Sequence, residues 1–317
     1  MTPRALASAA VAIAVLTLPA AAKADGPPVG FMTDGGVTAG SIRYAALPAG
    51  HGTLIEKLAL NGGRPLRFRY FKHPVGVAMI ATDGSAGGIS HDGRTLVLGA
   101  PRTSYPQLHS TLYVLSSRTL RVRRRISLKG DFSYDAMSPD GRTIYLIQLS
   151  STGDFLRYAV RAFDTRSRRL VREPVVDRRE PDEVMRGFPL TRVMSPDGRY
   201  AYTLYGGGKT PFVHALDTTR RSAACIDLPA MPDGALYKLR LNGKRLTVIA
   251  DDNPIAVVNT TTRQVSKAPP ARPVKQAPAD DGGGSGVGAW LLLAGAAAAL
   301  AAIVAIGARR WRARTTA

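Results

Sequence analysis

The chain has 317 residues, of which 45% are hydrophobic and 21% charged, so its composition is that of a folded protein rather than a disordered one. It carries 43 Lys and Arg residues against 23 Asp and Glu residues, a formal net charge of +20. The one cysteine, Cys225, excludes an intramolecular disulfide framework and a cysteine-based zinc finger.

The N-terminal segment, residues 1–24, has the features of a secretory signal peptide. Arg4 precedes an apolar stretch that runs from Ala5 to Ala22, and Ala22-Lys23-Ala24 is a small-x-small cleavage pattern. An uncleaved membrane anchor is the alternative, but the stretch is rich in alanine and ends at the cleavage pattern. We therefore expect cleavage after Ala24 and export of the rest of the chain.

The next segment, residues 29–82, predicts three β-strands. They are Ser41–Ala46, Thr53–Leu60 and Pro65–Phe71, and Asn61-Gly62-Gly63 is a hairpin turn between the last two.

Residues 87–267 contain a repeated turn. Its four copies are Ser90-His91-Asp92-Gly93-Arg94, Ser138-Pro139-Asp140-Gly141-Arg142, Ser195-Pro196-Asp197-Gly198-Arg199 and the degraded Leu241-Asn242-Gly243-Lys244. The copies follow one another at intervals of 48, 57 and 45 residues, a period typical of repeated supersecondary units. Proline presets φ for the turn, aspartate bonds to its own backbone, and glycine adopts the positive φ that reverses the chain.

Each turn is followed by two further strands with period-2 alternation. The first of them is Thr95–Gly99, Thr143–Ile147, Tyr200–Leu204 or Arg245–Ile249, and the second ends in three repeats at an Asp-Thr or Asn-Thr pair, as in Val213-His-Ala-Leu-Asp-Thr. A fourth strand follows that pair. Two hairpins per repeat predict a four-stranded antiparallel sheet, and such sheets at this period are the blades of a β-propeller.

The Ser-Pro-Asp-Gly-Arg turn followed by a strand and then by Val-x-x-x-Asp-Thr resembles the repeats of YVTN/lactonase-like and WD40-like β-propeller proteins, over roughly residues 87–267. The resemblance implies an all-β propeller in a bacterial, exported and membrane-anchored protein. It does not define an activity, because such propellers include enzymes, receptors and scaffolds.

With the N-terminal segment as one more blade we expect five blades, six being the alternative. We also expect an N-terminal strand to pair with the last blade and close the ring, since an open ring would expose a sheet edge.

The C-terminal part predicts a tether to a membrane. Residues 268–286 form a Pro- and Gly-rich linker, and Val287–Ile306 is a run of twenty uncharged residues, long enough for one transmembrane helix. Four arginines in the tail, residues 307–317, place that tail in the cytoplasm by the positive-inside rule. We therefore expect a single-pass protein of the cell membrane, with residues 25–267 as a propeller outside the cytoplasm.

One aligned position of the repeats suggests a binding site. The position carries Gly87, Asp135, Arg192 and Tyr237, close to the end of the strand that leads into each turn. If this strand is innermost, Asp135, Arg192 and Tyr237 could bind a ligand near the central channel. Alternatively, Asp135 and Arg192 form an ion pair between neighbouring blades, which would need both partners.

Other motifs predict neither a catalytic site nor a cofactor. The five histidines lack metal-ligand spacing, and we expect His91 on an exposed loop and His214 as a hydrogen-bonded core residue. The chain has no Gly-x-Ser-x-Gly nucleophile motif, and Gly206-Gly-Gly-Lys-Thr210 is a hairpin loop, since a Walker motif needs glycine where Thr203 stands. We expect no metal and no cofactor.

The charge distribution predicts anionic partners. Arg118–Arg125 is a basic strand and Asp177–Val184 a charged insertion, both expected as solvated surface. Without Arg4, Lys23 and the four tail arginines, 37 basic residues face 23 acidic ones, a net charge of +14. Such a surface attracts anionic envelope polymers or lipid head groups, and nucleic acid is excluded outside the cell. We expect a non-enzymatic binding or scaffold module, with anionic envelope polymers or other membrane proteins as partners. A propeller-type hydrolase or lyase is the alternative.

Overall fold

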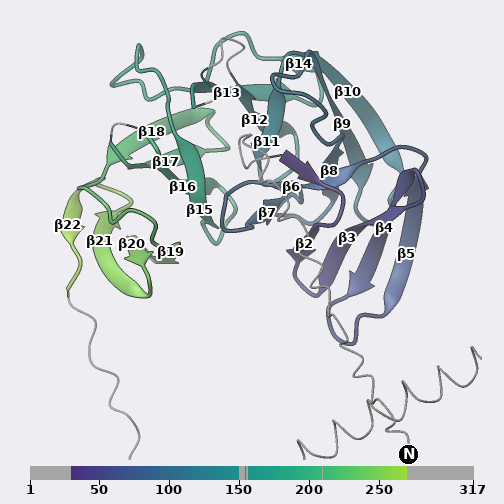
Figure 1. Ribbon diagram of the computed structural model, residues 1–317, viewed down its shortest axis with the longest axis horizontal. Helices are drawn as coiled ribbons and strands as arrows, with labels where there is room; N and C mark the ends of the chain where they lie inside the picture. Colours follow the sequence, from purple (N-terminus) through teal and green to yellow (C-terminus); the bar gives the residue numbers. More distant parts are fainter. Residues whose placement is uncertain (1–29, 150–153, 155, 209, 270–317) are drawn as a thin grey trace, which may run out of the picture. The chain divides into compact units, whose positions relative to one another are not determined.

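The computed structural model describes residues 30–149, 154, 156–208 and 210–269, and these residues form 22 β-strands. The strands build five antiparallel sheets that follow one another in chain order around an arc (Figure 1). The signal peptide, most of the linker and the membrane span that the sequence predicts lie outside the described residues. Among the described residues, no helix has the length and apolar character that crossing a bilayer requires.

The first sheet comes from the N-terminal segment and contains the three strands expected there. In spatial order its strands are β2 (Gly36–Ala39), β3 (Ile42–Ala49), β4 (Gly52–Ala59) and β5 (Pro65–Phe71). Gly62 and Gly63 of the predicted hairpin turn have φ values of 73° and 63°, a region that glycine enters without strain. Sequence analysis misses β2, because a strand of four residues is too short to show a two-residue period.

The second sheet contains the first strand of the chain, which corrects one prediction. In spatial order its strands are β1 (Gly30–Met32), β6 (Gly76–Met79), β8 (Thr95–Gly99), β9 (His109–Ser116) and β10 (Val122–Lys129), with the short β7 (Ala86–Gly87) also paired to β6. The prediction that an N-terminal strand pairs with the last sheet is wrong, since β1 pairs with β6. Gly99 makes this possible, because the Phe31 ring occupies the space beside it that a Cβ atom would need.

The remaining three sheets are regular four-stranded meanders. They contain β11 (Phe132–Met137), β12 (Thr143–Leu149), β13 (Tyr158–Asp164) and β14 (Arg169–Leu170); β15 (Phe188–Met194), β16 (Tyr200–Gly206), β17 (Phe212–Asp217) and β18 (Ser222–Asp227); and β19 (Tyr237–Asn242), β20 (Arg245–Ala250), β21 (Asn253–Asn259) and β22 (Val265–Lys267). Five successive antiparallel sheets, most of them four-stranded, are consistent with a β-propeller. The described residues form five sheets, the number expected from the repeat period.

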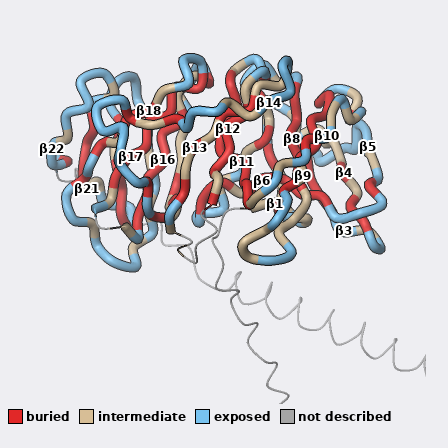
Figure 2. The backbone as a smooth tube through the Cα atoms, turned by 90° about the horizontal axis from the view of Figure 1, so that it is seen from above, coloured by how far each residue is buried: buried red, intermediate tan, exposed pale blue. Residues whose placement is uncertain are grey.

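One hydrophobic core lies between each sheet and the next. Leu96 and Leu98 of β8 pack with Ile55 of β4 between the first two sheets, and three further clusters of this kind follow along the arc. Buried residues follow the middle strands of the sheets, and exposed residues gather at the turns and on outer strands such as β5 and β22 (Figure 2). The sheets are therefore held together face to face, as in other packed β-sheets, with the apolar residues of both faces in contact.

The repeated turn is closed by hydrogen bonds between its own residues. In the copy after β11, Ser138 Oγ donates to Asp140 Oδ1 at 2.7 Å, and the same carboxylate oxygen accepts the Arg142 N–H at 3.0 Å. The Ser138 hydroxyl also accepts the N–H of Thr143 at 2.9 Å, and Gly141 has a φ of 72°. The turns at Ser90 and Ser195 repeat these contacts. The motif is therefore a local structural element.

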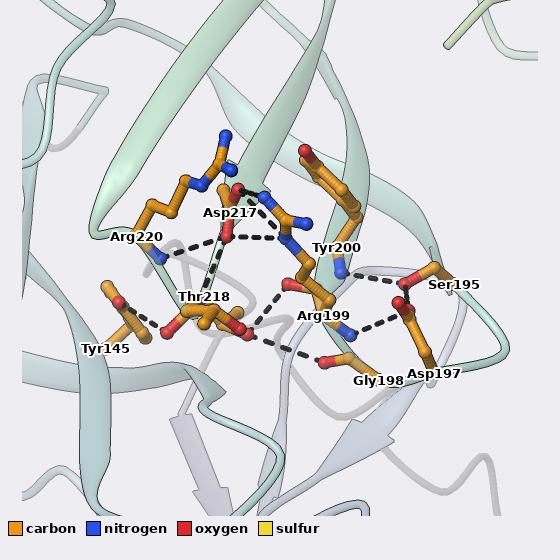
Figure 3. Close-up of polar contacts among 10 residues, drawn as sticks. Tyr145, Ser195, Asp197, Gly198, Arg199, Tyr200, Asp217, Thr218 and Arg220 are labelled. Carbon is orange, nitrogen blue, oxygen red and sulfur yellow. Dashed lines mark hydrogen bonds and ion pairs between the residues drawn. The ribbon is translucent and has the colours of Figure 1, made fainter. Parts of the chain in front are cut away.

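The two motifs of each repeat are bonded to one another. In the fourth sheet, Arg199 Nε lies 3.0 Å from Asp217 Oδ2, and the Thr218 hydroxyl donates to the Arg199 carbonyl at 2.7 Å (Figure 3). The carbonyl of Thr218 accepts a bond from the Tyr145 hydroxyl of the third sheet at 2.8 Å. The Asp-Thr pair thus closes its own hairpin and also fixes the position of the neighbouring sheet.

Candidate functional site

One aligned position of the repeats falls on a short inner strand in each of four successive sheets. Its residues are Gly87, Asp135, Arg192 and Tyr237. These inner strands lie close together, since β11 contacts β6 and β7 and β15 contacts β19. The repeat alignment therefore identifies a structurally equivalent position, and the question is which of its side chains meet.

Asp135 reaches the fourth sheet because β11 contains a β-bulge. The pairing of β11 with β12 shifts between Tyr134 and Ala136, so Asp135 is left out of the ladder. Tyr134 packs in the core between the second and third sheets, whereas Ala136 packs in the core between the third and fourth. The extra residue directs the Asp135 side chain toward β15, a common use of a bulge.

Asp135 and Arg192 form a buried ion pair between the third and fourth sheets. Arg192 Nη2 contacts Asp135 Oδ1, Nη1 donates to the carbonyl oxygen of Asp135, and Nε donates to the Thr203 hydroxyl at 2.7 Å. The two charged side chains are only 3% and 2% exposed. Of the two interpretations of these residues, the structure shows the ion pair.

The Arg192 guanidinium stays charged, and one oxygen of the Asp135 carboxylate has no hydrogen-bond donor among the described residues. Burial alone would lower the pKa of the Arg192 guanidinium, but the adjacent Asp135 carboxylate raises this pKa above its ordinary value. Arg192 therefore stays charged. Asp135 Oδ2 is buried and has no hydrogen-bond partner among the described residues. The carboxylate consequently has one oxygen that can still accept a donor.

A row of side chains extends from Arg192 across the fourth sheet. Thr203 lies opposite Arg192, His214 lies opposite Thr203, and Cys225 lies opposite His214. Because directly opposite residues of antiparallel strands share one face, all four point toward the third sheet. The region between these two sheets therefore combines an ion pair, a hydroxyl, an imidazole and a thiol.

His214 is a core residue without a hydrogen-bond partner. Its side chain is 0% exposed, and neither ring nitrogen has a partner among the described residues. Burial lowers the pKa of the imidazole to about 4, so His214 is neutral near pH 7. The Tyr205 ring meets it edge-on at 6.2 Å. The prediction of a core histidine is confirmed, but the prediction that its nitrogens are hydrogen-bonded is wrong.

Tyr237 does not join Asp135 and Arg192. Its hydroxyl donates to the carbonyl of Pro232, and its ring lines a hollow of about 530 Å³ together with Phe188 and Leu190 of β15. Asp135 and Arg192 line a different hollow, of about 380 Å³, next to Tyr134 and His91. The three aligned residues thus belong to two separate places along the inner strands.

The smaller hollow lies where four sheets meet. It is lined by residues of β2, β7, β11 and β15 and by the turns that follow β7 and β15. Its volume is within the range of small-molecule sites. Asp135, with its unused oxygen, is the acid at its wall. This hollow is the place among the described residues where a small ligand would meet the predicted site residues.

Three other predictions concern loops and metal ligands. His91 is exposed, as expected, and it lies against Gly198 of the next-but-one repeated turn. The glycine-rich segment that starts at Gly206 lies between β16 and β17, so its interpretation as a hairpin loop is confirmed. Among the described residues, no group of three His, Cys, Asp or Glu side chains is placed to hold a metal ion.

The charged insertion is exposed at residues 178–184, as expected, but its first residue, Asp177, is buried. Asp177 is 3% exposed and accepts the N–H of Cys225 at 3.0 Å, which ties the insertion to β18. Burial would raise the pKa of Asp177, but hydrogen bonds from Arg179 and from the backbone lower it to about 2. Sequence analysis misses this contact because the partner lies 48 residues away.

The basic segment of the second sheet is exposed, as expected. It forms the turn before β10 and β10 itself, the outermost strand of that sheet. Arg121, Arg123, Arg125 and Lys129 are exposed, and none of the ion pairs among the described residues includes a side chain of residues 117–130. This strand therefore presents positive charge to the solvent.

No protein-family model matches the chain, and no curated protein matches it. Among solved structures, it is similar to TolB from Acinetobacter baumannii, at 13% identity over 75% of this chain and 53% of that chain, with a TM-score of 0.41. It is also similar to BamB from Moraxella catarrhalis, at 16% identity over 75% of this chain and 66% of that chain, with a TM-score of 0.42. A third similar structure is the β-propeller domain of Cps50 (Swd1) from Myceliophteria thermophila, at 12% identity over 74% of this chain and 66% of that chain, with a TM-score of 0.42.

The chain thus spans about half the length of the TolB structure. The class of the protein follows from its own strand order, which is that of an all-β protein built from successive antiparallel sheets.

Proposed function

We propose that the chain is a non-enzymatic binding or scaffold module of the cell envelope, held outside the cytoplasm by a single membrane span. The sequence supports this division of the chain: residues 1–24 as signal peptide, 25–267 as propeller, 268–286 as linker, 287–306 as span and 307–317 as cytoplasmic tail. A tethered domain meets wall polymers and membrane neighbours at high effective concentration, which favours recognition of partners near the membrane.

The observation that carries the binding role is the exposed charge of β10 and its preceding turn. Six Lys and Arg residues lie within residues 117–130 and no Asp or Glu does. Their side chains take part in none of the ion pairs among the described residues. Cations without acidic neighbours attract an anionic partner by a field that salt screens over about 8 Å at physiological ionic strength.

The inner strands support the same role less directly. An enzyme of this architecture would need a group of acids, bases or metal ligands that converge on one hollow. Arg192 instead donates from three nitrogens to groups of the protein itself. Asp135 and Arg192, the acid and the base of the predicted site, therefore join two sheets to each other.

A propeller-type hydrolase or lyase is the second candidate, and one observation favours it. The hollow of about 380 Å³ contains Asp135, whose Oδ2 has no partner among the described residues. Because that oxygen is buried, a substrate hydroxyl or amide could donate to it only after the Asp135 side chain turns toward the hollow. Turnover of a lactone or a glycan by the purified full chain would establish the enzyme and contradict the binding module.

The test of the proposed function is retention of envelope components. The full chain, purified in detergent and immobilised, is incubated with solubilised envelope at low and at high salt. We expect an anionic component that is retained at low salt and released at high salt, and weaker retention by Arg123→Gln/Arg125→Gln. Retention that is unchanged by salt and by this variant would contradict binding through β10.

The proposed topology has its own test. Protease treatment of intact cells should release a fragment close in size to residues 25–267, because the proposed topology places the linker outside the cytoplasm. If the domain is digested only after the cells are permeabilised, the proposed orientation is wrong.

A further inference from the structure

The positive charge of the described domain is concentrated on the outermost strand of each sheet and the turn that leads into it. These five outer segments are residues 60–72, 117–130, 165–172, 218–227 and 260–267. Together they contain 18 Lys and Arg residues and one acid, Asp227. The rest of residues 30–269 contains 17 basic and 19 acidic residues. The excess of positive charge is therefore a property of the outer segments alone.

These cations are available to a partner. Sixteen of the 18 are exposed, and Arg69 and Arg124 are half-buried. None of the ion pairs among the described residues uses any of the 18 side chains. By contrast, Arg102, Arg179, Arg192 and Arg199, which lie outside the outer segments, each pair with an acid. Every cation that forms an ion pair among the described residues therefore lies outside the outer segments.

The outer segments follow one another along the edge of the arc. Strands β5, β10, β14, β18 and β22 are the last strands of their sheets and lie on the outside in Figure 1, whereas β2, β7, β11, β15 and β19 lie toward the centre. Alternate residues of one strand are about 7 Å apart, which is within the Debye length of about 8 Å at physiological salt. The fields of neighbouring cations on a strand therefore merge.

We propose that the five outer segments form one continuous binding site for a linear, phosphate-bearing polyanion that runs along several sheets. The inference rests on the proposed function, because it specifies the partner of the same basic surface. Fifteen of the 18 cations are arginines, whose planar guanidinium matches phosphate oxygens in a bidentate geometry. A flexible linear polymer can follow the edge of the arc, whereas a planar membrane that touches this edge reaches only neighbouring sheets.

The test uses binding of the full chain to long-chain polyphosphate, with tripolyphosphate at equal phosphate concentration as the short probe and phosphatidylglycerol vesicles as the planar one. We expect the long chain to bind at least tenfold more tightly per phosphate than tripolyphosphate, because it engages several sheets at once. The affinity should fall linearly with the logarithm of the salt concentration, with a slope set by the number of phosphates that the protein neutralises.

Paired variants locate the contact. Arg123→Gln/Arg125→Gln removes two cations from the second sheet, and Arg166→Gln/Arg169→Gln removes two from the third. Each pair should lower the slope by about 1.4, at about 0.7 for each cation that meets a single-stranded polyanion. The matched control is Arg43→Gln/Arg240→Gln, which removes two exposed cations of β3 and β19, outside the outer segments, and should leave both affinity and slope unchanged. Thermal melting of each variant verifies that it is folded.

The outcomes separate this inference from the proposed function. Weaker binding by both outer pairs but not by the control supports a site that spans sheets. An effect of the β10 pair alone, or equal affinity per phosphate for tripolyphosphate, overturns the linear site and leaves a local anion site. Binding to the vesicles without binding to long-chain polyphosphate overturns it in favour of a membrane surface. Absence of binding to every anionic probe contradicts the proposed function as well.

Discussion

Asp135 of β11 and Arg192 of β15 are 57 residues apart in the sequence and form the ion pair that joins the third sheet to the fourth. Both side chains are almost completely buried. A buried pair of this kind is weak evidence for net stability, since two charges have lost their hydration. Loss of one partner, however, leaves an uncompensated charge in the core, and this asymmetry can be measured.

We therefore expect Asp135→Ala to lower the free energy of unfolding by about 3–5 kcal/mol, because Arg192 remains buried without a counter-charge. Arg192→Ala should cost a similar amount, since it leaves the Asp135 carboxylate in the core. Chemical denaturation of each purified variant provides the measurement.

The double variant Asp135→Leu/Arg192→Met is the control for this prediction. It removes both charges and keeps apolar volume, so it should lose much less stability than the sum of the two single variants. Single variants that melt at the wild-type temperature would show that the pair does not hold the two sheets together.

The repeat period and the turn chemistry made most of this fold predictable. The Ser-x-Asp-Gly turns are closed by bonds within six residues, as at Ser138 and Thr143, so their sequence contains all that they need. The same regularity placed Asp135 and Arg192 at one structural position, on sheets that proved adjacent. Properties that depend on local hydrogen bonds and on equivalent positions were therefore accessible from the sequence.

The sequence does not show which neighbours a side chain meets outside the repeated turns. The pairing of β1 with β6 depends on the space beside Gly99, and the burial of Asp177 depends on the N–H of Cys225. Tyr237 aligns with Arg192 but bonds to Pro232, five residues before it. A period identifies equivalent backbone positions, and the neighbours of each side chain are set by the particular residues of the next sheet.

His214 should make the stability of the domain depend on pH. Its folded pKa of about 4 lies below the ordinary value of 6.5, because burial opposes the charged form; Asp135 favours protonation and Arg192 opposes it. The unfolded chain therefore takes up this proton first as the pH falls. We expect the stabilising contribution to be complete above pH 6.5 and to be lost progressively down to about pH 4, by about 3 kcal/mol in total.

The variant His214→Leu isolates this contribution from that of other titrating groups. It should remove about 2–3 kcal/mol of the difference in unfolding free energy between pH 7 and pH 4.5 that the wild type shows, in denaturation curves recorded side by side. The rest remains, because carboxyls with lowered pKa values, such as Asp177 and Asp217, titrate in both proteins. Stability at pH 7 should be retained, because neither ring nitrogen has a partner among the described residues that the substitution would leave unpaired. If the pH dependence of the variant equals that of the wild type, His214 is not buried as described.

The hydroxyl of Tyr145 should contribute to the contact between the third and fourth sheets. It donates to the Thr218 carbonyl at 2.8 Å, and the Tyr145 side chain is 0% exposed. Tyr145→Phe leaves that carbonyl without this donor in a buried place, so we expect a loss of about 1–3 kcal/mol in denaturation.

Tyr70→Phe is the matched control for Tyr145→Phe. The Tyr70 hydroxyl lies 3.4 Å from the Ala49 carbonyl at an exposed position, so its removal should change stability by less than about 0.5 kcal/mol. Equal effects of the two substitutions would contradict a structural role for the bond between the sheets.

The docking of β1 should depend on the absence of a side chain at Gly99. A Cβ atom at this position would lie 2.3–2.4 Å from three carbon atoms of the Phe31 ring, closer than any stable contact. Gly99→Ala should therefore displace Phe31 and release β1 from β6, which speeds amide hydrogen exchange at Met32 and Val77, two residues that face each other across the pair. Adding Phe31→Ala to Gly99→Ala removes the ring that clashes, so the double variant should regain part of the protection. Gly243→Ala is the control: its Cβ atom meets open space, and its positive φ of 56° confines the strain to a turn of the last sheet, so exchange in β1 should be unchanged. Wild-type exchange in Gly99→Ala would show that β1 is not held against β6 by the packing of Phe31.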